Sequence, residues 1–424
     1  MREDRATEPL SKYCDANKQS LGRETPSDFE FRYIDLSSVD EGKIDWHKTR
    51  ALSLAGSPSR ARRIVQPGDV LFSTVRPGLM GHAILREPAD LPIIGSTGFA
   101  VLSPKPNVDG RFIFHSLFLD GFKRQVAQFE VGSNYPAINE SDLRRVRLGT
   151  VDGPNQKLIA DILDALDDVI SEADAAIDKL LAVRIGLTAD FFTFGITPSG
   201  RPRSSCNVAD TKLGRVPSDW FPRSLVSLTE SITSGSRGWA KYYSDTGAKF
   251  LRIGNLTRKH INLRLDDLVY VTPPRAQEGS RTAVRENDLL ISITADLGVI
   301  GSIPPDFGEA YVNQHIALIR LNENEVNPRW PAHFLSSRRS QIMFEKLNDQ
   351  GAKAGINLPA VGKILVPLPP REEQDELVKR LDAADDEVAR FRVEREKLVS
   401  LRLGLRDDLL SGRIPVLALQ EAAE

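Results

Sequence analysis

The stretch LDALDDVISEADAAIDKLLAVRIGL, residues 163–187, returns later in the chain as LDAADDEVARFRVEREKLVSLRLGL, residues 381–405. A constant offset of 218 aligns residues 156–196 with 374–414 without a gap, and 13 of these 41 positions are identical. Unrelated segments share far fewer positions by chance, so we interpret the match as an internal repeat. The repeat decides how the rest of the chain is divided.

Both copies place apolar side chains at alternating spacings of four and three residues, from Ile159 to Phe191 and from Leu377 to Leu409. This heptad pattern, uninterrupted by proline, predicts two long amphipathic helices whose apolar stripes have to be buried. The most economical partner for each stripe is the other copy. Arg184 and Arg402 lie at matching positions of the seam, so each is expected to snorkel or to meet an acid of the other helix.

A fainter repeat precedes each helix. The paired segments, first copy before second, are 67–85 with 286–304, 96–104 with 313–321, 132–138 with 354–361, and 146–156 with 366–374. In the first pair, a Gly-Asp turn in 67–85 and an Asn-Asp turn in 286–304 each precede a β-rich run. The third pair matches Asn134 with Asn357. Short alternating runs with frequent Gly, Pro and Asn predict β segments with irregular loops. Each half is therefore expected to be a β-rich globule of roughly 150 residues followed by one long helix.

The 424 residues suggest two to four domains, and 41% hydrophobic with 27% charged residues is ordinary for a soluble globular protein. No signal peptide or membrane span is predicted, and Cys14 and Cys206 are expected to be free thiols in a reducing compartment. The six scattered histidines show no metal-site spacing. Net charge alternates along the chain: +2 over residues 1–150, −6 over 151–196, +6 over 197–370 and −4 over 371–424. A polyanion would prefer the first and third segments.

Catalytic motifs fail on inspection. GINLPAVGK, residues 355–363, has six residues between its glycines where a phosphate-binding loop needs four, and Ile364 replaces its Ser or Thr. EREK, residues 394–397, resembles part of a nuclease core but lies within the heptad helix, where a solvated charge run is the simpler interpretation. TPPR and LPPR lack the aromatic residue of an adenine methyltransferase motif. The sequence therefore predicts a binding protein and not an enzyme.

The order of features is a globule, an Asn-x-Pro-Ala segment, a Pro-rich link and a Gln-led helix, all repeated. This order resembles the specificity (S) subunits of type I restriction-modification systems. GRVPSDW at 214–220 resembles the opening of a target-recognition domain, and KFLRIGNL at 249–256 and RYIDLSSV at 32–39 resemble the strand that follows. INLPAV at 356–361, VPLPPREEQDELVKRLD at 366–382 and LRDDLLSGRI at 405–414 resemble the family's closing segments. The first half departs from the pattern, because SLGRETPSDFEFRYIDL occupies the place of its opening.

The resemblance implies an α+β fold in which two β-rich target-recognition domains are separated by two long helices that form an antiparallel coiled coil, with a pseudo-twofold internal repeat. The expected parts are a first recognition domain (1–152), a first spacer helix (153–196), a second recognition domain (197–370), a second spacer helix (371–415) and a C-terminal tail (416–424). Such a subunit reads a bipartite double-stranded DNA target. It assembles in the cytoplasm with two methyltransferase subunits and with restriction (helicase-nuclease) subunits. S-adenosylmethionine, ATP and Mg would act in those partners, and no cofactor, metal or catalytic residue is expected in this chain.

Arginine, lysine and amide side chains in loops are the groups best suited to pair with base edges and phosphates. The candidates for DNA contact in the first half are Arg60, Arg62, Arg63, Arg76, Lys123, Arg124, Ser133, Asn134 and Tyr135. Those in the second half are Ser236, Arg237, Lys241, Arg258, Lys259, Thr294, Lys353 and Asn357. Each has the alternative of an ordinary exposed charge or turn residue. For Asn134 and Asn357 that alternative is a turn that shapes the exit from the domain.

Two other classes of function stay open on the sequence. One is a cytosolic coiled-coil interaction scaffold without DNA specificity, and the other is a self-contained DNA methyltransferase whose site the motifs do not reveal.

Overall fold

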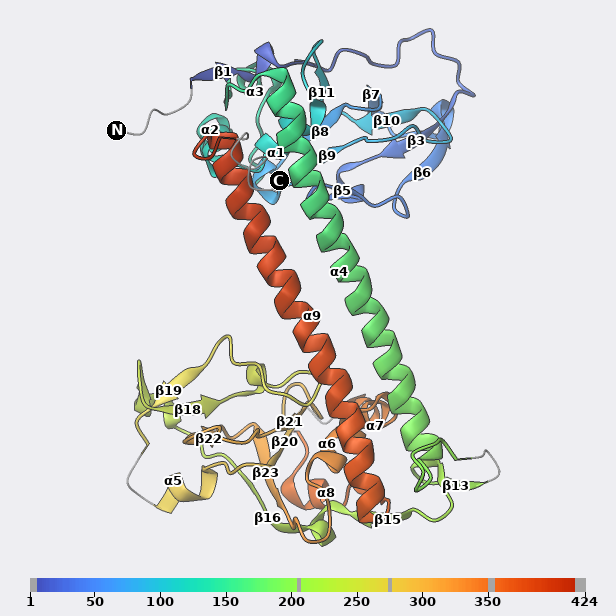
Figure 1. The fold of residues 1–424 in the computed structure, drawn as a ribbon, viewed down its shortest axis with the longest axis vertical. Helices are drawn as coiled ribbons and strands as arrows, with labels where there is room; N and C mark the ends of the chain where they lie inside the picture. The colour runs from blue at the N-terminus through green and yellow to red at the C-terminus, as the bar shows by residue number, and fades with distance from the viewer. Residues whose placement is uncertain (1–5, 204–206, 274–276, 350–354, 416–424) are drawn as a thin grey trace. The chain divides into compact units, whose positions relative to one another are not determined.

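The structure is a computed structural model that describes residues 6–203, 207–273, 277–349 and 355–415. It divides into two compact units, Met1–Asp174 with Val393–Glu424, and Ala175–Arg392. Helix α4 (Gly153–Phe194) begins in the first unit and ends in the second, and α9 (Arg371–Ser411) does the reverse (Figure 1). Each unit thus contains a β-rich globule and a part of both long helices.

The first unit is built on two four-stranded sheets. In order across each sheet, the strands are β6 (Arg50–Ser53), β3 (Glu30–Ile34), β10 (Ile93–Ser96) and β7 (Ala61–Val65), then β2 (Cys14–Ala16), β11 (Phe99–Pro104), β8 (Val70–Ser73) and β9 (Ala83–Ile84). Two short pairs add β1 (Thr7–Pro9) with β12 (Arg147–Gly149), and β4 (Val39–Asp40) with β5 (Lys43–Ile44). The helices before α4 are α1 (Gly110–Ser116), α2 (Asp120–Phe129) and α3 (Glu140–Leu143).

The second unit repeats this plan. The sheet that corresponds to β2-β11-β8-β9 contains, in order, β16 (Thr229–Ser234), β23 (Ile316–Leu321), β20 (Leu289–Ser292) and β21 (Ile300–Ser302). The other sheet contains, in order, β17 (Tyr243–Ser244), β19 (Val269–Val271), β18 (Ala248–Leu251) and β22 (Ala310–Val312). The short pairs are β15 (Phe221–Ser224) with β24 (Leu365–Leu368), and β13 (Val208–Thr211) with β14 (Gly214–Pro217). The helices are α5 (Gln277–Thr282), α6 (Arg329–Ser336), α7 (Arg338–Asp349) and α8 (Leu358–Gly362).

The faint repeat predicted for the globules is confirmed by shared details. Strand β10 pairs in parallel with β3, and β22 pairs in parallel with β18. The turns before β8 and β20 are also alike, because Asp69 accepts a hydrogen bond from the Gln66 amide and Asp288 accepts one from the Arg285 amide. The second half adds the β13–β14 hairpin, which has no counterpart among the described residues of the first half.

The start of each long helix is fixed by a buried glutamine. The Gln156 side chain accepts from the Asp109 amide and donates to the Val151 carbonyl, both in the segments that lead into helices. Gln374 makes the equivalent bonds with Asn327 and Pro369, which match Asp109 and Val151 at the offset of the repeat. Because a buried amide costs free energy unless its hydrogen bonds are made, these bonds set where each helix leaves its globule.

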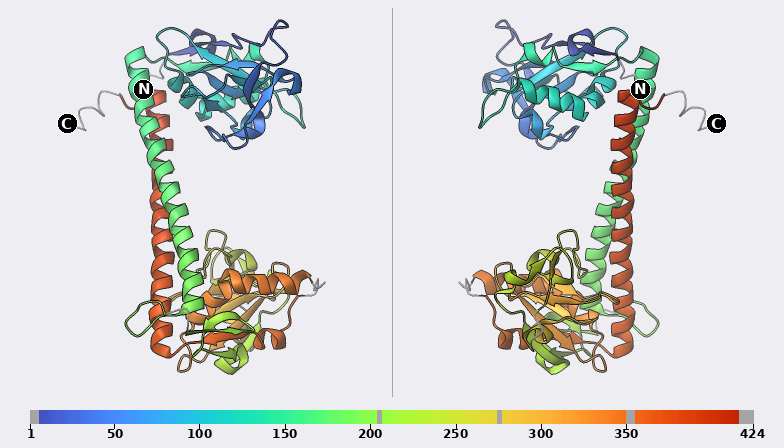
Figure 2. Two further views of the ribbon diagram at one scale, coloured as in Figure 1. Left: turned by 90° about the vertical axis from the view of Figure 1, so that its right-hand side faces the viewer. Right: turned by 90° about the vertical axis from the view of Figure 1, so that its left-hand side faces the viewer.

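The two long helices lie side by side and run antiparallel within each unit, as the ribbon views show (Figure 2). Ion pairs join Arg402 to Asp167 at 2.7 Å and Arg395 to Asp174 at 3.0 Å in the first unit. In the second unit Arg184 pairs with Asp385. Snorkelling and an acid of the other helix were the two alternatives predicted for Arg184 and Arg402. The structure shows the acid for both, and the two acids match each other in the repeat.

In each unit, a cluster of a histidine, an aspartate and arginines joins the globule to the helix that follows it. We call these two clusters the first and the second helix junction. In the first unit His115 Nε2 lies 2.8 Å from Asp164, which also binds Arg86 and Arg111. In the second unit His333 Nε2 lies 2.7 Å from Asp382, which also binds Arg329. Every member of the second junction follows its counterpart in the first by the offset of the repeat.

The main core of each unit packs its globule against the long helices. In the first unit the core includes Ile159 and Leu163 of α4 with Leu409 of α9. In the second it includes Phe192 of α4 with Leu377 of α9. Cys14 is a buried free thiol, and burial raises its pKa to about 12, whereas Cys206 lies outside the described residues. No helix among the described residues is long and apolar enough to cross a membrane.

Candidate nucleic-acid interface

Four loop segments of the second unit converge where β20 and β22 end. The Ile293 amide donates to the His315 carbonyl, and the Ile356 amide donates to the Ile293 carbonyl. Ser236 forms a β-bridge with Asn313. The Thr294 hydroxyl lies 2.6 Å from His315 Nδ1, so side-chain bonds tie the same segments together. We call this convergence the second loop face.

Two glycines allow these backbones to approach so closely. A Cβ on Gly235 would lie 2.1 Å from the Val312 carbonyl oxygen, and one on Gly355 would lie 2.3 Å from that of Ile293. Gly355 also has a φ of +83°, which disfavours any other residue. The second loop face therefore depends on glycine at both positions.

The first unit carries an equivalent surface, the first loop face. The Thr97 amide donates to the Arg60 carbonyl, and the Thr74 amide donates to the Gly98 carbonyl, the counterpart of His315. The Ile138 amide donates to the Thr74 carbonyl, as Ile356 does to Ile293. The same strand ends and the same following segments are therefore brought together in both halves.

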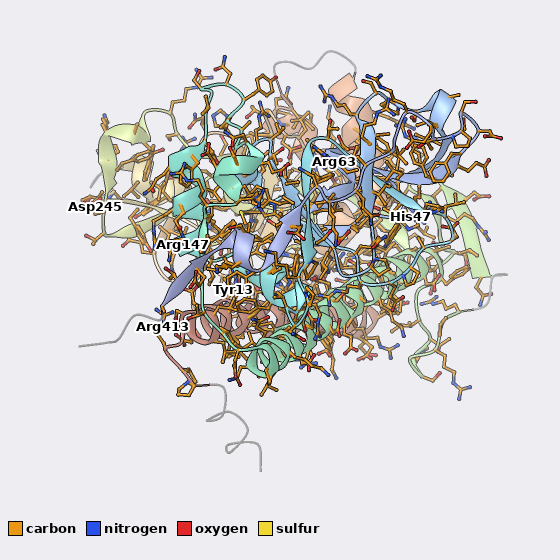
Figure 3. The ribbon with its side chains drawn as sticks, turned by 90° about the horizontal axis from the view of Figure 1, so that it is seen from above. Tyr13, His47, Arg63, Arg147, Asp245 and Arg413 are labelled. Carbon is orange, nitrogen blue, oxygen red and sulfur yellow. The ribbon has the colours of Figure 1, made fainter. Side chains whose placement is uncertain are left out.

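A serine–arginine pair recurs on both faces. Arg63 Nη1 donates to the Ser20 hydroxyl at 3.3 Å, and Arg281 Nη2 donates to the Ser236 hydroxyl at 2.8 Å. Figure 3 shows Arg63 among the strands of the first unit, and Arg281 directly precedes Thr282, the counterpart of Arg63 in the strand register. The Arg63 Nε is buried without a hydrogen-bond acceptor among the described residues. The pair places a guanidinium beside a serine hydroxyl on each face.

Strained backbone marks one loop on each face. Arg76 has a φ of +47°, and Ala295, at the equivalent place after β20, has a φ of +58°. The left-handed region costs a non-glycine residue about 1–2 kcal/mol and persists only where the surrounding structure imposes it. The Arg76 guanidinium lies 4.3 Å from the centre of the Tyr135 ring and donates to the Asn134 carbonyl. Tyr135 is 69% exposed, so this cation–π pair stands in solvent.

The structure brings several of the predicted residues together. Arg60, Arg63, Arg76, Asn134 and Tyr135 surround the first loop face, and Ser236 and Thr294 belong to the second. Exposed neighbours in the same segments are Arg62, Ser133 and Arg237. The structure gives these residues positions on a surface and leaves their role as DNA contacts a prediction.

Other predicted residues have internal partners or lie elsewhere. Lys123 pairs with Asp120 on α2, where Arg124 is exposed, and Lys241 lies 4.9 Å from the Tyr242 ring. Arg258 binds Asp296, the Leu297 carbonyl and Gln341. Lys353 lies outside the described residues.

The predicted match of Asn134 with Asn357 is wrong. Asn357 caps α8, because its side chain accepts from the Ala360 amide at 2.9 Å. Asn139 caps α3 in the same way by accepting from the Asp142 amide, and Asn139 is the residue that matches Asn357 at the offset of the repeat. The short Asn-x-Pro-Ala resemblance led to a register that differs from the structural one. Asn357 therefore has a capping role and Asn134 lies in an exposed turn.

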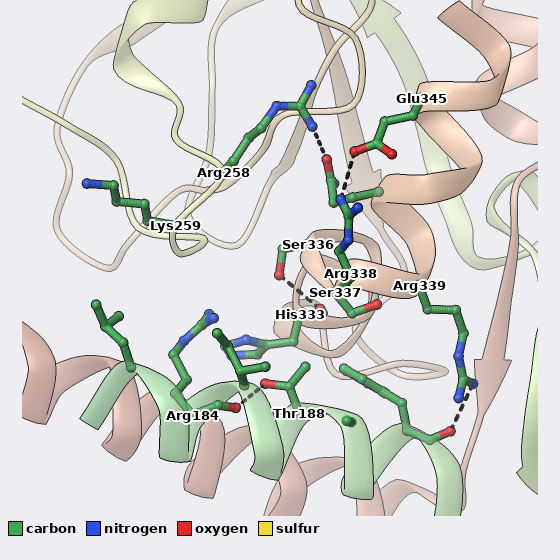
Figure 4. A pocket seen from close by; sticks show the side chains of 15 residues that line it. Arg184, Thr188, Arg258, Lys259, His333, Ser336, Ser337, Arg338, Arg339 and Glu345 are labelled. Atoms are coloured by element: carbon green, nitrogen blue, oxygen red, sulfur yellow. Dashed lines mark hydrogen bonds and ion pairs between the residues drawn. The ribbon is translucent and has the colours of Figure 1, made fainter. Parts of the chain in front are cut away.

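Beside α4 the second unit has a pocket of about 450 Å³ (Figure 4). Arg184, Thr188, Arg258, Lys259 and His333 are among the residues that line it. The first unit has a smaller pocket of about 270 Å³, lined by His115, Arg402 and Arg406 among others. His115 matches His333 and Arg402 matches Arg184, so the two pockets occupy equivalent places.

The sequence interpretation missed the helix junctions and the serine–arginine pairs. A comparison of residues 105–117 with 323–335 would have found Arg111 with Arg329 and His115 with His333. Ser20 and Ser236 do not obey the offset of the repeat, so a constant offset would not have found that pair. In the first junction His115, Asp164 and Asp167 lie close enough to suggest a metal site. Both carboxylates are bound by arginines, however, which makes the group part of the ion-pair network.

The sequence pattern of one protein family, described as the type I restriction modification DNA specificity domain, matches residues 38–181 and again 225–396. These two matches cover most of the chain and both globules. The chain belongs to the type I restriction-modification DNA specificity family. Its place is that of a specificity subunit, and not of a catalytic one.

Individual relatives agree with this assignment. The putative type I restriction enzyme MjaX specificity subunit of Methanocaldococcus jannaschii is 24% identical over 396 residues, which cover 90% of this chain and 86% of that protein. The solved S subunit of a type I system from M. genitalium has a TM-score of 0.58 at 14% identity, covering 97% of both chains. A chain solved in work on complex assembly and conformational transition of the type I system has a TM-score of 0.56 at 21% identity, over 98% of this chain and 99% of that one. These likenesses show a shared fold with two domains and a long helix pair.

Proposed function

We propose that this specificity subunit reads a split double-stranded DNA target, with one loop face for each part of the target. Residues 1–152 and 197–370 would be the two recognition domains, and residues 153–196 and 371–415 the spacer helices. The chain would direct adenine-N6 methylation and restriction that partner subunits carry out in the cytoplasm. Those partners would be two methyltransferase subunits, which use S-adenosylmethionine, and restriction subunits, which use ATP and Mg.

One observation carries the proposal. The two halves build the same loop face from the same strand ends, yet they place different side chains on it. Arg76 in the first half corresponds to Ala295 in the second, and Gly98 corresponds to His315. A repeated frame with divergent loops suits two readers of unlike base sequences, because base choice depends on the identity of the side chains in the groove. The net positive charge of residues 1–150 and 197–370 favours phosphate contact, and the acidic helices do not need to contact phosphate.

Arg237 is the sharpest test in the second domain. It is exposed and lies next to Ser236 of the serine–arginine pair. We expect Arg237→Ala to weaken specific DNA binding by the assembled complex by ~1–3 kcal/mol. Binding would be measured by fluorescence anisotropy on a duplex that contains the methylated motif, in at least two salt concentrations.

The matched control is Arg223→Ala. Arg223 lies in the same unit and pairs with Glu325 and Ser227. It belongs to β15, which pairs with β24 and contributes none of the contacts that define the second loop face. The control should bind DNA as the unmodified chain does. Equal affinities for the Arg237 variant and the unmodified chain would remove Arg237 from the interface.

A further inference from the structure

Arg406, near the end of α9, lacks a partner where one is needed. The residue is only 8% exposed, and no hydrogen bond or ion pair joins its side chain to any described residue. Its Nε is buried without an acceptor, and its guanidinium carbon lies 5.4 Å from the centre of the Phe118 ring. Burial, and then the charge of Arg402, lower the pKa of Arg406. Asp407, Asp167 and Asp120 act on Arg406 only through space. A buried cation without an acceptor costs free energy, so this position calls for an anion in direct contact, which the described residues do not provide.

Arg406 lines the pocket of about 270 Å³ in the first unit. Two neighbouring arginines also line it, but both are already neutralised: Arg86 by Asp164 and Arg402 by Asp167. Arg406 is thus the lining arginine that is left to bind a ligand. Phe114 and Phe118 give the pocket apolar walls beside this charge.

The repeat shows that the fold does not require an arginine here. The residue that matches Arg406 at the offset of the repeat is Thr188, which lines the equivalent pocket of the second unit (Figure 4). Its hydroxyl donates to the Arg184 carbonyl of its own helix at 2.7 Å, so its polar group is satisfied internally. The unpaired charge is therefore a special feature of the first unit.

The charges around the pocket limit what can bind. Glu41, Asp168 and Lys43 also line it, and none of the three side chains has a hydrogen-bonded or ion-paired partner among the described residues, so the two acids outnumber the one lysine. These acids would repel a polyanion such as a DNA backbone, whose neighbouring phosphates would add further negative charge. A single planar carboxylate has the charge and the geometry that a guanidinium binds with two parallel hydrogen bonds. The aromatic walls would contact the methylene groups that carry such a carboxylate.

We propose that this pocket binds the carboxylate of one acidic side chain from a protein that assembles with the chain. Arg406 donates to the carboxylate, and Phe114 and Phe118 pack against its methylene groups. The second unit, with Thr188 in place of the arginine, does not bind it. The identity of that protein as a subunit of the complex rests on the proposed function. The pocket's preference for a carboxylate does not.

The first experiment uses the full-length chain and N-acetyl-glutamate amide, a probe with a single carboxylate. Its uncharged counterpart, N-acetyl-glutamine amide, is the control ligand. The glutamate probe should raise the Tm of the unmodified chain, and raise it further with each increase in probe concentration, whereas the glutamine probe should not. Arg406→Met should weaken the response roughly tenfold or more, because charge-assisted hydrogen bonds are lost.

The ligand-free variant provides a second readout. Because Arg406 has no described partner, Arg406→Met should leave the Tm of the ligand-free chain unchanged or raise it. A lower Tm would overturn the proposal, since it would show that Arg406 stabilises the free chain. Equal responses of the two chains to the glutamate probe would also overturn it, and so would a stronger response to inorganic phosphate than to the glutamate probe.

The last arm addresses the partner. Arg406→Met and Arg406→Thr should reduce co-purification of the methyltransferase subunit, whereas Arg50→Met, which removes an exposed arginine of β6 in the same unit, should not. Co-purification that is unchanged in the Arg406 variants would overturn the assignment of the pocket to a complex partner. Failure of the assembled complex to bind DNA specifically would instead count against the proposed function, and it would leave the probe titration to decide the pocket.

Discussion

His115 and His333 hold the same place in the two halves, and each joins a globule to the long helix that follows it. Burial alone would raise the pKa of Asp382, but hydrogen bonds from His333 and Arg329 outweigh it and lower the pKa to about 2. The pKa of Asp164 is likewise lowered by His115 and Arg86 against the effect of burial. Carboxylates held in this way stabilise the fold only while they are ionised.

The pH dependence follows from the sign of this shift. The pKa of an aspartate in an unfolded chain is ~3.9. The helix junction at Asp382 therefore adds its full share to the free energy of unfolding above about pH 4, and this share is lost as the pH falls toward 2. We expect Asp382→Asn to lower the free energy of unfolding by about 2 kcal/mol at pH 7, and by progressively less below pH 4. Urea titrations at several pH values measure this difference.

Asp386→Asn is the matched control, because Asp386 lies on the same helix and is exposed. Its effect should be small at every pH. The contrary result is a loss of unfolding free energy in Asp382→Asn that is the same from pH 7 to pH 3. That result would contradict the assignment of the shifted pKa to this junction.

Individual side chains were the part of the molecule least open to prediction. Arg63 and Ser20 are far apart along the chain, as are Thr294 and His315, so their contacts depend on how distant loops converge. The Asn134–Asn357 match failed because a short motif resembled the segment that caps α8, while the structural counterpart is Asn139. Local patterns hold no information on such long-range packing.

The long helices were the most predictable elements. A heptad pattern is a local signal, and it predicted both helices and the seam positions of Arg184 and Arg402. Alternating runs and turn residues predicted β segments, such as β8 and β20 after their Gly-Asp and Asn-Asp turns, but not which strands pair. The heptad pattern could not show that the Arg184–Asp385 and Arg402–Asp167 ion pairs differ in burial. The Asp385 side chain is 3% exposed, whereas that of Asp167 is 26% exposed.

This difference predicts unequal costs at equivalent positions. Asp385→Ala leaves Arg184 mostly buried without a partner and should lower the free energy of unfolding by ~3 kcal/mol. Asp167→Ala removes a more exposed pair and should cost about 1 kcal/mol or less. Double-mutant cycles with Arg184→Ala and Arg402→Ala, followed by chemical denaturation, measure the two coupling energies. Equal coupling energies would contradict the burial argument.

The helix pair also predicts how the target is spaced. Removal of one heptad from residues 164–190 should change the spacer that the complex tolerates between the two parts of its target, or abolish activity. The best-matched deletion takes residues 171–177 together with 392–398, because it keeps the register of Asp167 with Arg402 and removes both Asp174 and Arg395. Each helix then loses about 10 Å, which corresponds to a spacer about 3 base pairs shorter.

Spacer preference would be measured by methylation of duplexes with spacers of graded length, after circular dichroism has shown that the helices are retained. An unaltered preference in a folded, active deletion variant would count against the helices as the element that sets the gap.

At the level of the whole chain, duplication explains why one set of contacts is found twice. The helix junctions, the helix-start glutamines and the seam ion pairs all recur at the same constant offset. The loop faces share their backbone contacts and differ in their side chains. A duplicated frame with two unlike faces is the physical basis for expecting a target of two unlike parts. This division could be predicted from the sequence alone because the helices diverged less than the globules.

The most direct test is to map methylated adenines in a random-sequence DNA library treated with the complex reconstituted from this chain and its methyltransferase partner. We expect a split, asymmetric motif. Arg76→Ala should relax base preference in one part of that motif only, and Arg237→Ala in the other part only. A continuous motif, or a loss of preference at the same bases in both variants, would contradict the claim that each half of the chain reads its own part of the target.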